Sequence, residues 1–233
     1  LNDCWPVASW SSIDYFGRWK ALHYVSKRFF NPVLISACEE GPVVELHVSN
    51  ETNKEQAGTV IWRLCDDSKK INGTHILETG KLEVSVLPFT SKKVFVKDFS
   101  QELSTEYAHR DAYLMYEFVQ GSSSQRGSVL FTKPKHFSFK KDFPLIEVFE
   151  TETFFEISIK AQHYFRSIEL SLQGFDALFS DNYFDLGLSD TALVRVDKQE
   201  IWLTAPSEGD CVKDITKEQF EKALRLRSVA DSF

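Results

Sequence analysis

Hydrophobic and polar residues alternate along most of the chain after Pro32, which is the pattern of β-strands with one buried face. The clearest run places Val44, Leu46 and Val48 on one face. Similar runs recur as far as Leu203, separated by turns rich in Gly, Ser, Asn and Asp. Because repeated short strands with such turns are typical of antiparallel sandwiches, we expect a mainly β protein.

The residues before Pro32 follow a helical period instead. Asn31 precedes the proline and therefore disfavours the helical conformation, so the predicted helix runs from Gly17 to Phe30. Its apolar stripe comprises Trp19, Leu22, His23, Ser26, Phe29 and Phe30. Little in the first thirty residues could receive this stripe, so we expect its partner surface to lie upstream. Asp14 is expected to accept backbone N–H groups near the helix start.

A basic, proline-bearing passage at residues 133–141 interrupts the β pattern, which then restarts. We place a domain boundary there, which gives β-sandwiches at residues 32–138 and 139–233. The sequence Thr216-Lys-Glu-Gln219 has the form of a capping box and predicts a short helix within the second sandwich.

The composition, with 42% hydrophobic and 26% charged residues, is that of a globular protein, and 20 Phe residues suit pleated surfaces. A net charge of −7 argues against a nucleic-acid partner, and no apolar run is long enough to span a bilayer. We therefore expect neither nucleic acid nor membrane as a partner.

The four cysteines lie far apart, so we expect scattered buried thiols rather than a zinc site or a disulfide framework; they are Cys4, Cys38, Cys65 and Cys211. This weakly favours a bacterial cytoplasmic or periplasmic setting, with a lysosomal or secreted one if the protein is eukaryotic. Sequons at Asn50 and Asn72 would matter only in a secretory pathway.

The opening loop is the leading candidate for a binding site. Asn2, Asp3 and Trp5 place acceptors beside an aromatic ring, a combination that suits sugar recognition, although Trp5 could equally plug a hole between domains. No pair of carboxyl groups, Asp3 and Asp14 included, has a spacing that demands glycoside hydrolysis. We also find no nucleophile motif, phosphate loop, metal site or cofactor site. The polar and aromatic segment at residues 179–185 is expected to be a tight turn.

Several long strings resemble β-mannosidases of glycoside hydrolase family 2. They are Leu1-Asn-Asp-Cys-Trp-Pro-Val-Ala-Ser-Trp-Ser-Ser-Ile-Asp-Tyr15, Gly17-Arg-Trp-Lys-Ala-Leu-His-Tyr24, Phe29-Phe-Asn-Pro-Val33, Phe179-Ser-Asp-Asn-Tyr-Phe-Asp185 and Arg227-Ser-Val-Ala-Asp-Ser-Phe233. The resemblance implies that residues 1–31 are the last loop and helix of a catalytic (β/α)8 barrel, followed by two immunoglobulin-like sandwiches.

The resemblance also implies a function, the retaining removal of terminal β-linked mannose from the non-reducing end of a mannoside or manno-oligosaccharide. Two catalytic glutamates would lie upstream of Leu1, so this chain alone would be inactive. Trp5 would wall the sugar pocket, while Asn2 and Asp3 would bond sugar hydroxyls or hold the loop. β-Galactosidase or β-glucuronidase activity, or a non-catalytic carbohydrate-binding or adhesion module, remain alternatives.

Overall fold

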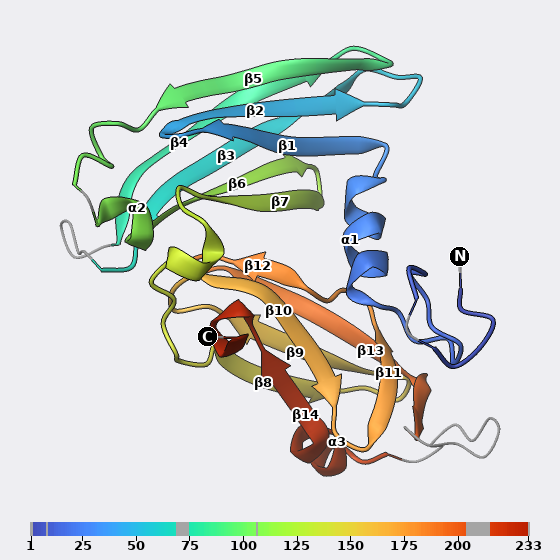
Figure 1. Ribbon diagram of the computed structural model, residues 1–233. Helices are drawn as coiled ribbons and strands as arrows, with labels where there is room; N and C mark the ends of the chain where they lie inside the picture. The colour runs from blue at the N-terminus through green and yellow to red at the C-terminus, as the bar shows by residue number, and fades with distance from the viewer. Residues whose placement is uncertain (1, 8, 69–74, 106, 204–214, 233) are drawn as a thin grey trace. The chain divides into compact units, whose positions relative to one another are not determined.

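The computed structural model describes residues 2–7, 9–68, 75–105, 107–203 and 215–232. The chain divides into two compact units, each with its own core (Figure 1). One unit is Arg28–Phe139, and the other combines Leu1–Lys27 with Lys140–Phe233.

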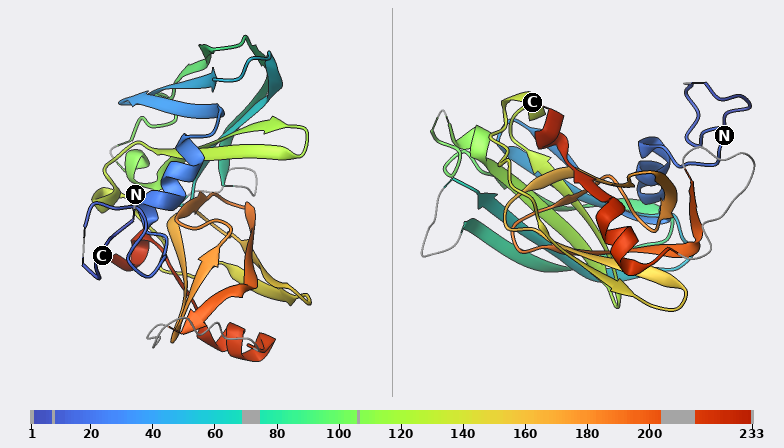
Figure 2. Two further views of the ribbon diagram at one scale, coloured as in Figure 1. Left: turned by 90° about the vertical axis from the view of Figure 1, so that its right-hand side faces the viewer. Right: turned by 90° about the horizontal axis from the view of Figure 1, so that it is seen from below.

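The Arg28–Phe139 unit is an antiparallel sandwich of a three-stranded sheet, ordered β1-β2-β5, and a four-stranded sheet, ordered β4-β3-β6-β7 (Figures 1 and 2). Its elements are β1 (Val33–Glu40), β2 (Val43–Asn50), β3 (Gln56–Asp66), β4 (Ile76–Val86), β5 (Thr90–Asp98), α2 (Ala108–Asp111), β6 (Ala112–Gln120), β7 (Ser123–Leu130) and the short 3-10 helix η1 (Pro134–His136).

The core of this sandwich follows the alternation in the sequence. Val44, Leu46 and Val48 of β2 are fully buried and pack with Leu64 of β3 in the same cluster. The ring of Trp62 lies close to the backbone of β4, where a Cβ added at Gly80 would stand 2.8 Å from the indole atoms. Glycine is thus required at that position of β4 by the close approach of a core ring.

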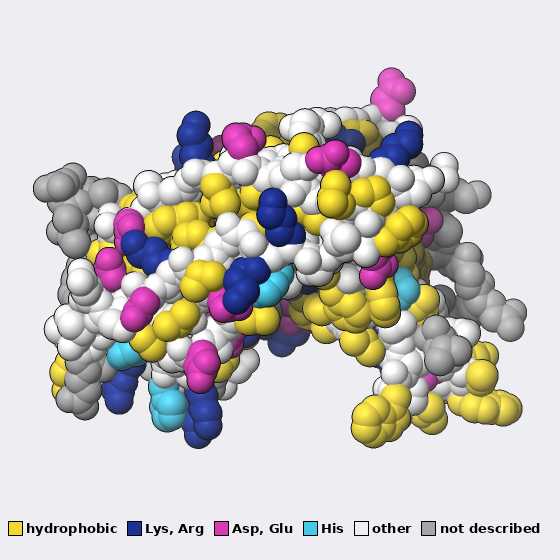
Figure 3. All heavy atoms as spheres, turned by 90° about the horizontal axis from the view of Figure 1, so that it is seen from above, with side chains coloured by type: hydrophobic (Ala, Val, Ile, Leu, Met, Phe, Trp, Pro, Cys, Tyr) yellow, Lys and Arg dark blue, Asp and Glu magenta, His cyan; other side chains and the backbone are white. Residues whose placement is uncertain are grey.

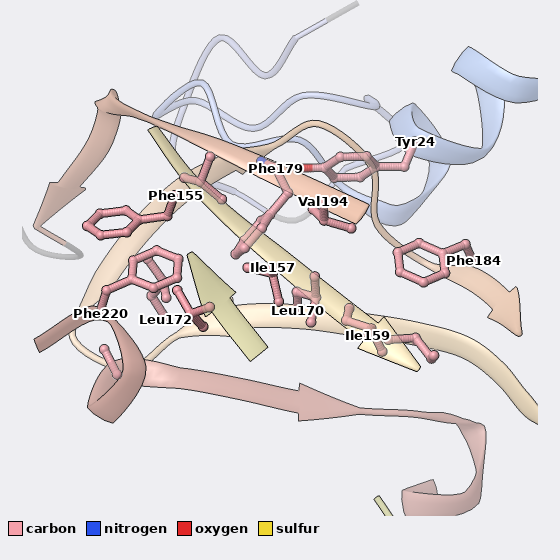
Figure 4. Packing of buried hydrophobic residues seen from close by; sticks show 14 of the residues in the cluster. Tyr24, Phe155, Ile157, Ile159, Leu170, Leu172, Phe179, Phe184, Val194 and Phe220 are labelled. Carbon is pink, nitrogen blue, oxygen red and sulfur yellow. Dashed lines mark hydrogen bonds between the residues drawn. The ribbon is translucent and has the colours of Figure 1, made fainter. Parts of the chain in front are cut away.

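The other unit is built on strands ordered β12-β10-β11-β13-β9-β8, with β14 beside β10. Its elements are α1 (Ala21–Phe29, whose last two residues fall in the other unit), β8 (Leu145–Glu150), β9 (Phe154–Lys160), β10 (Phe165–Leu172), β11 (Phe175–Phe179), β12 (Phe184–Leu186), β13 (Thr191–Leu203), α3 (Lys217–Ala223), β14 (Leu224–Arg227) and the 3-10 helix η2 (Val229–Ser232). Side chains from β9, β10 and β13 share one core, so the strands enclose it from two sides (Figure 4).

Helix α3 covers one end of this core. Phe220 is fully buried and its ring stacks on Phe155, with centroids 4.2 Å apart (Figure 4). The helix begins with the predicted capping box, in which the Thr216 hydroxyl accepts from Gln219 N–H and the Gln219 side chain accepts from Thr216 N–H. The prediction from Thr216-Lys-Glu-Gln219 is therefore confirmed.

Helix α1 packs on this same unit through a residue outside the predicted stripe. Tyr24 is 2% exposed, and its hydroxyl accepts a hydrogen bond from Phe179 N–H at 3.3 Å (Figure 4). One turn later, the Lys27 ammonium group donates to the carbonyl oxygen of Ser180. This face of the helix is covered by a segment more than 150 residues later in the chain. An upstream partner surface for the apolar stripe stays a prediction.

The predicted stripe is only partly exposed, because Trp19 packs against this core while Leu22, Phe29 and Phe30 lie outside. Leu22 is 51% exposed and Phe29 44% exposed, and Val25, between them, is 39% exposed. The helix also begins at Ala21 rather than Gly17, since Trp19 pairs with Ile13 in an isolated bridge before the first helical turn.

Candidate functional site

The three predicted binding residues lie on a loop that folds back on itself before α1. Asn2 and Ile13 form a parallel bridge, and Asp3 N–H donates to the carbonyl oxygen of Ile13 at 3.0 Å. Lys20 N–H then donates to the carbonyl oxygen of Ser12, which joins the end of the loop to its middle. We call residues 2–20 the N-terminal loop.

Asp3 points inward rather than towards solvent. It is 5% exposed, its Oδ1 accepts from the Ser9 hydroxyl, and its Oδ2 accepts from the Lys20 ammonium group at 2.9 Å. These bonds to Lys20 and then Ser9 lower the pKa of Asp3 to about 2, so the carboxyl group is ionised at neutral pH.

Trp5 and Asn2, in contrast, face outward. Trp5 is 72% exposed, and Asn2 is also exposed. The same loop carries further exposed apolar side chains, so that its exposed apolar residues are Trp5, Val7, Trp10, Tyr15 and Phe16. In Figure 3 hydrophobic side chains project at the lower right, where this loop lies. A gathering of large exposed apolar groups marks a surface that contacts a ligand or another part of a protein.

Asp14 and Arg18 tie the loop to the sandwich. Asp14 Oδ1 accepts from Phe16 N–H and Arg18 N–H, each at 2.9 Å, and its other oxygen pairs with the Arg18 guanidinium group. Arg18 also reaches Asp176 of β11 at 3.5 Å, and burial raises the pKa of the Asp176 carboxyl group. The predicted acceptor role of Asp14 is confirmed, but the groups it binds form a turn closed by Gly17 at φ +84°.

His23 packs beside the N-terminal loop, and the 179–185 segment forms the turn that the sequence predicted. The His23 ring lies 4.3 Å from Trp19, and its Nδ1 is 3.1 Å from the Ser12 hydroxyl. Asn182 is 3% exposed and pairs with both backbone groups of Leu170, while Tyr183, at φ +55°, turns the chain towards β12. The segment therefore holds its turn against Leu170 of β10.

A groove of about 650 Å³ lies away from the predicted site. It is lined by Ile146, Glu147, Val148, Phe149, Lys217, Glu221, Leu224 and Leu226.

In the part of the chain that the structure describes, no three His, Cys, Asp or Glu side chains are grouped to hold a metal ion. None of the described helices has the length and apolar character of a bilayer-spanning segment.

The cysteine prediction was partly wrong. Cys65 is buried, but Cys4 and Cys38 are exposed, because Cys4 lies on the outside of the N-terminal loop and Cys38 in the solvent-exposed second half of β1. Cys4 and Cys38 are free thiols. Cys211 lies outside the described residues.

Of the two sequons, Asn50 is a buried structural residue and Asn72 lies outside the described residues. Asn50 Nδ2 donates to the carbonyl oxygens of Lys54, Val86 and Leu87. The triplet at Asn50 is therefore part of a turn in the fold rather than an accessible acceptor for a glycan.

Family comparisons match each sandwich separately. Residues 43–136 match the family described as Mannosidase Ig/CBM-like domain, and residues 142–232 match a mannosidase family described as Ig-fold domain. Each sandwich is thus similar to an immunoglobulin-type domain of mannosidases. The predicted resemblance to glycoside hydrolase family 2 β-mannosidases is thereby confirmed, as is a mainly β fold with two immunoglobulin-like domains.

Curated relatives of this chain are named β-mannosidases. The β-mannosidase of Mus musculus is 38% identical over 64 residues, covering 28% of this chain and 7% of that protein. β-Mannosidase A of Aspergillus terreus is 35% identical over 72 residues, covering 30% of this chain and 8% of that protein. The matched stretches thus span less than a tenth of the length of these relatives.

Solved structures share the fold at low identity. The β-D-mannosidase of Dictyoglomus thermophilum superposes with a TM-score of 0.73 and 17% identity, covering 97% of this chain and 25% of that one. The exo-chitosanase CsxA of Amycolatopsis orientalis gives a TM-score of 0.56 and 11% identity, covering 98% and 29%.

Proposed function

We propose that this chain is the C-terminal part of an exo-acting, retaining β-mannosidase. Residues 1–31 would be the last loop and helix of its (β/α)8 barrel, and the two sandwiches would brace that barrel. The domain matches and the names of the curated relatives support the activity of the whole enzyme.

One observation carries the proposed role of this chain in the sugar pocket, namely an exposed indole on an anchored loop. Trp5 is 72% exposed although Asp3, two residues earlier, is buried, so the loop presents an aromatic face from a fixed base. Aromatic faces cover the C–H face of a sugar ring, and the amide of Asn2 can bond its hydroxyls. Trp5 would then form one wall of the pocket.

The chemistry would come from elsewhere in the enzyme. Retention of configuration needs two carboxyl groups about 5–5.5 Å apart across the scissile bond. In this loop Asp3 is paired with Lys20 and Asp14 with Arg18, so each carboxylate already has a cation. The 233-residue chain alone is therefore expected to be inactive.

The exposed apolar face of α1 fits the same proposal. Leu22, Val25 and Phe29 lie three and four positions apart and are each more than a third exposed. A helix with one face on a sandwich and another apolar face left open is suited to packing between two layers. The second layer would be the upstream barrel.

The test compares the full-length enzyme with the isolated 233-residue chain on an aryl β-mannoside. Turnover by the former alone is expected, and turnover by the isolated chain would overturn the division of roles. In the full-length enzyme, Trp5→Ala should lower kcat/KM about tenfold or more, on the order of 1.4 kcal/mol. Trp10→Ala, which removes another exposed indole from the same loop, serves as the matched control and should lower it less.

A carbohydrate-binding module is the second candidate, favoured by the "CBM-like" description of the family that residues 43–136 match. Titration of the isolated chain with manno-oligosaccharides separates the two, since a module binds without the barrel. A panel of aryl β-galactoside, β-glucuronide and β-mannoside substrates distinguishes the sister activities.

A further inference from the structure

Lys20 is the point at which the N-terminal loop closes. Its ammonium group donates to Asp3 Oδ2 at 2.9 Å, to the Ser11 hydroxyl at 3.0 Å and to the carbonyl oxygen of Ser9 at 3.3 Å. The Ser9 hydroxyl donates in turn to the other carboxylate oxygen of Asp3. One side chain beside the helix start thus gathers three points of the loop.

Asp3 has its carboxylate committed to these bonds. Its side chain is 2% exposed and each oxygen has a partner within the loop. A sugar hydroxyl could reach it only by displacing Lys20 or Ser9, which would leave a buried charge without its partner at a large energetic cost. Asp3 is therefore placed to hold the loop rather than to contact a ligand.

We call the bonds of Lys20 to Asp3, Ser9 and Ser11 the clamp, and α1 connects it to the sandwich core. Lys20 immediately precedes the helix, and Tyr24, on its first turn, is buried against Phe179 and Tyr183. In the other direction, Asp3 lies two residues before the exposed Trp5. A continuous set of contacts therefore joins the core to the base of the segment that carries the indole.

We propose that Lys20 is a positioning residue, whose ammonium group holds Asp3 and thereby fixes the segment that presents Trp5, and that Asp3 does not itself bind sugar. The effect of Lys20 on substrate binding rests on the proposed function, whereas its role in holding the loop does not. Because Trp5 would contact the sugar in the ground state and the transition state alike, loosening its base should raise KM and leave kcat nearly unchanged.

The variants Lys20→Met and Asp3→Asn each break the clamp with little change in volume, and Lys20→Arg keeps the charge. In the full-length enzyme, Lys20→Met should raise KM for an aryl β-mannoside about tenfold, with kcat within about twofold, and Lys20→Arg should restore most of the loss. Lys81→Met, which removes an exposed lysine from β4, is the matched control and should behave as wild type.

The double variant decides between clamp and ligand. If both residues act through one bond, Lys20→Met/Asp3→Asn should be no worse than either single change. If Asp3 bonds a sugar hydroxyl, the two losses in kcat/KM should multiply, and that result would overturn the proposal.

Amide hydrogen exchange supplies a readout that does not depend on activity. Residues 3–13 should exchange about tenfold faster in Lys20→Met and in Asp3→Asn, while β10 keeps its protection and so reports an intact fold. Unchanged exchange in the loop would refute the clamp. If the wild-type enzyme shows no turnover of aryl β-mannosides, the proposed function fails, and the exchange experiment still decides whether Lys20 holds the loop.

Discussion

Replacing Asn50 by aspartate should strongly destabilise the Arg28–Phe139 sandwich. Asn50 is 1% exposed and stands at the end of β2, where its Nδ2 donates to the carbonyl oxygens of Lys54, Val86 and Leu87. Its Oδ1 accepts from the backbone N–H and the hydroxyl of Thr52. One amide thereby joins β2, the following turn and the end of β4.

The expected magnitude follows from the lost donors. Each net hydrogen bond contributes about 1 kcal/mol, and a buried carbonyl left without a donor costs about 1–3 kcal/mol. In the Asn50→Asp variant, an ionised carboxylate would face three carbonyl oxygens, and a protonated carboxyl group would have a single donor for them. We expect a loss of about 3–5 kcal/mol in the free energy of unfolding, which for a unit of this size lowers its melting temperature by roughly 10 °C or more.

Scanning calorimetry of the 233-residue chain measures this loss, with Asn53→Asp as the control, because Asn53 is exposed in the same turn. The control should melt within about 2 °C of wild type. In a secretory host, mass spectrometry should find Asn50 unmodified, since its side chain is buried. An Asn50→Asp protein as stable as the control, or a glycan on Asn50 of the folded protein, would refute the reasoning.

Two further substitutions and one titration test other parts of the structure. Gly80→Ala should destabilise the first sandwich by about 1–3 kcal/mol in a urea titration, because its Cβ would meet the Trp62 indole; wild-type stability would contradict the close approach. Tyr24→Phe should cost about 1 kcal/mol by leaving Phe179 N–H without its acceptor, measured on the transition of the other unit, and no change there would contradict that bond. The carboxyl carbon of Asp3 should titrate near pH 2 by NMR. The stabilising effect of its ion pair with Lys20 is therefore complete above pH 3.8 and is lost as the pH falls through about 2. A titration midpoint at or above 3.8 would disprove the pairing.

Local patterns predicted the parts of the fold that depend on neighbours in sequence. The alternation at Val44, Leu46 and Val48 determined which face of β2 is buried, and the spacing of Thr216 and Gln219 predicted the cap of α3. In β2 the buried side chains recur at every second residue, and in α3 the two capping groups stand three residues apart, so both signals are visible within a short stretch of sequence.

Contacts between distant residues could not be predicted in this way. The partner of Tyr24 lies 155 residues away, and the partner of Arg18 in β11 lies 158 residues away. The residue types and the resemblance together singled out Asn2, Asp3 and Trp5 from the N-terminal loop, but neither gave a role to Lys20, whose bond to Asp3 crosses 17 residues. Without the three-dimensional path of the loop, Asp3 could not be told from an exposed acceptor.

The division of the chain into units has a consequence for synthesis on the ribosome. Arg28–Phe139 is continuous in sequence, so this sandwich can complete its core as soon as β7 has emerged. The other unit is interrupted in sequence by this sandwich. Tyr24 is made long before its partner Phe179, and β10 is made before β14, with which it pairs. Until the later strands of this unit are released, Tyr24 and Trp19 remain without the core on which they pack, and newly made chains are exposed to aggregation for that interval.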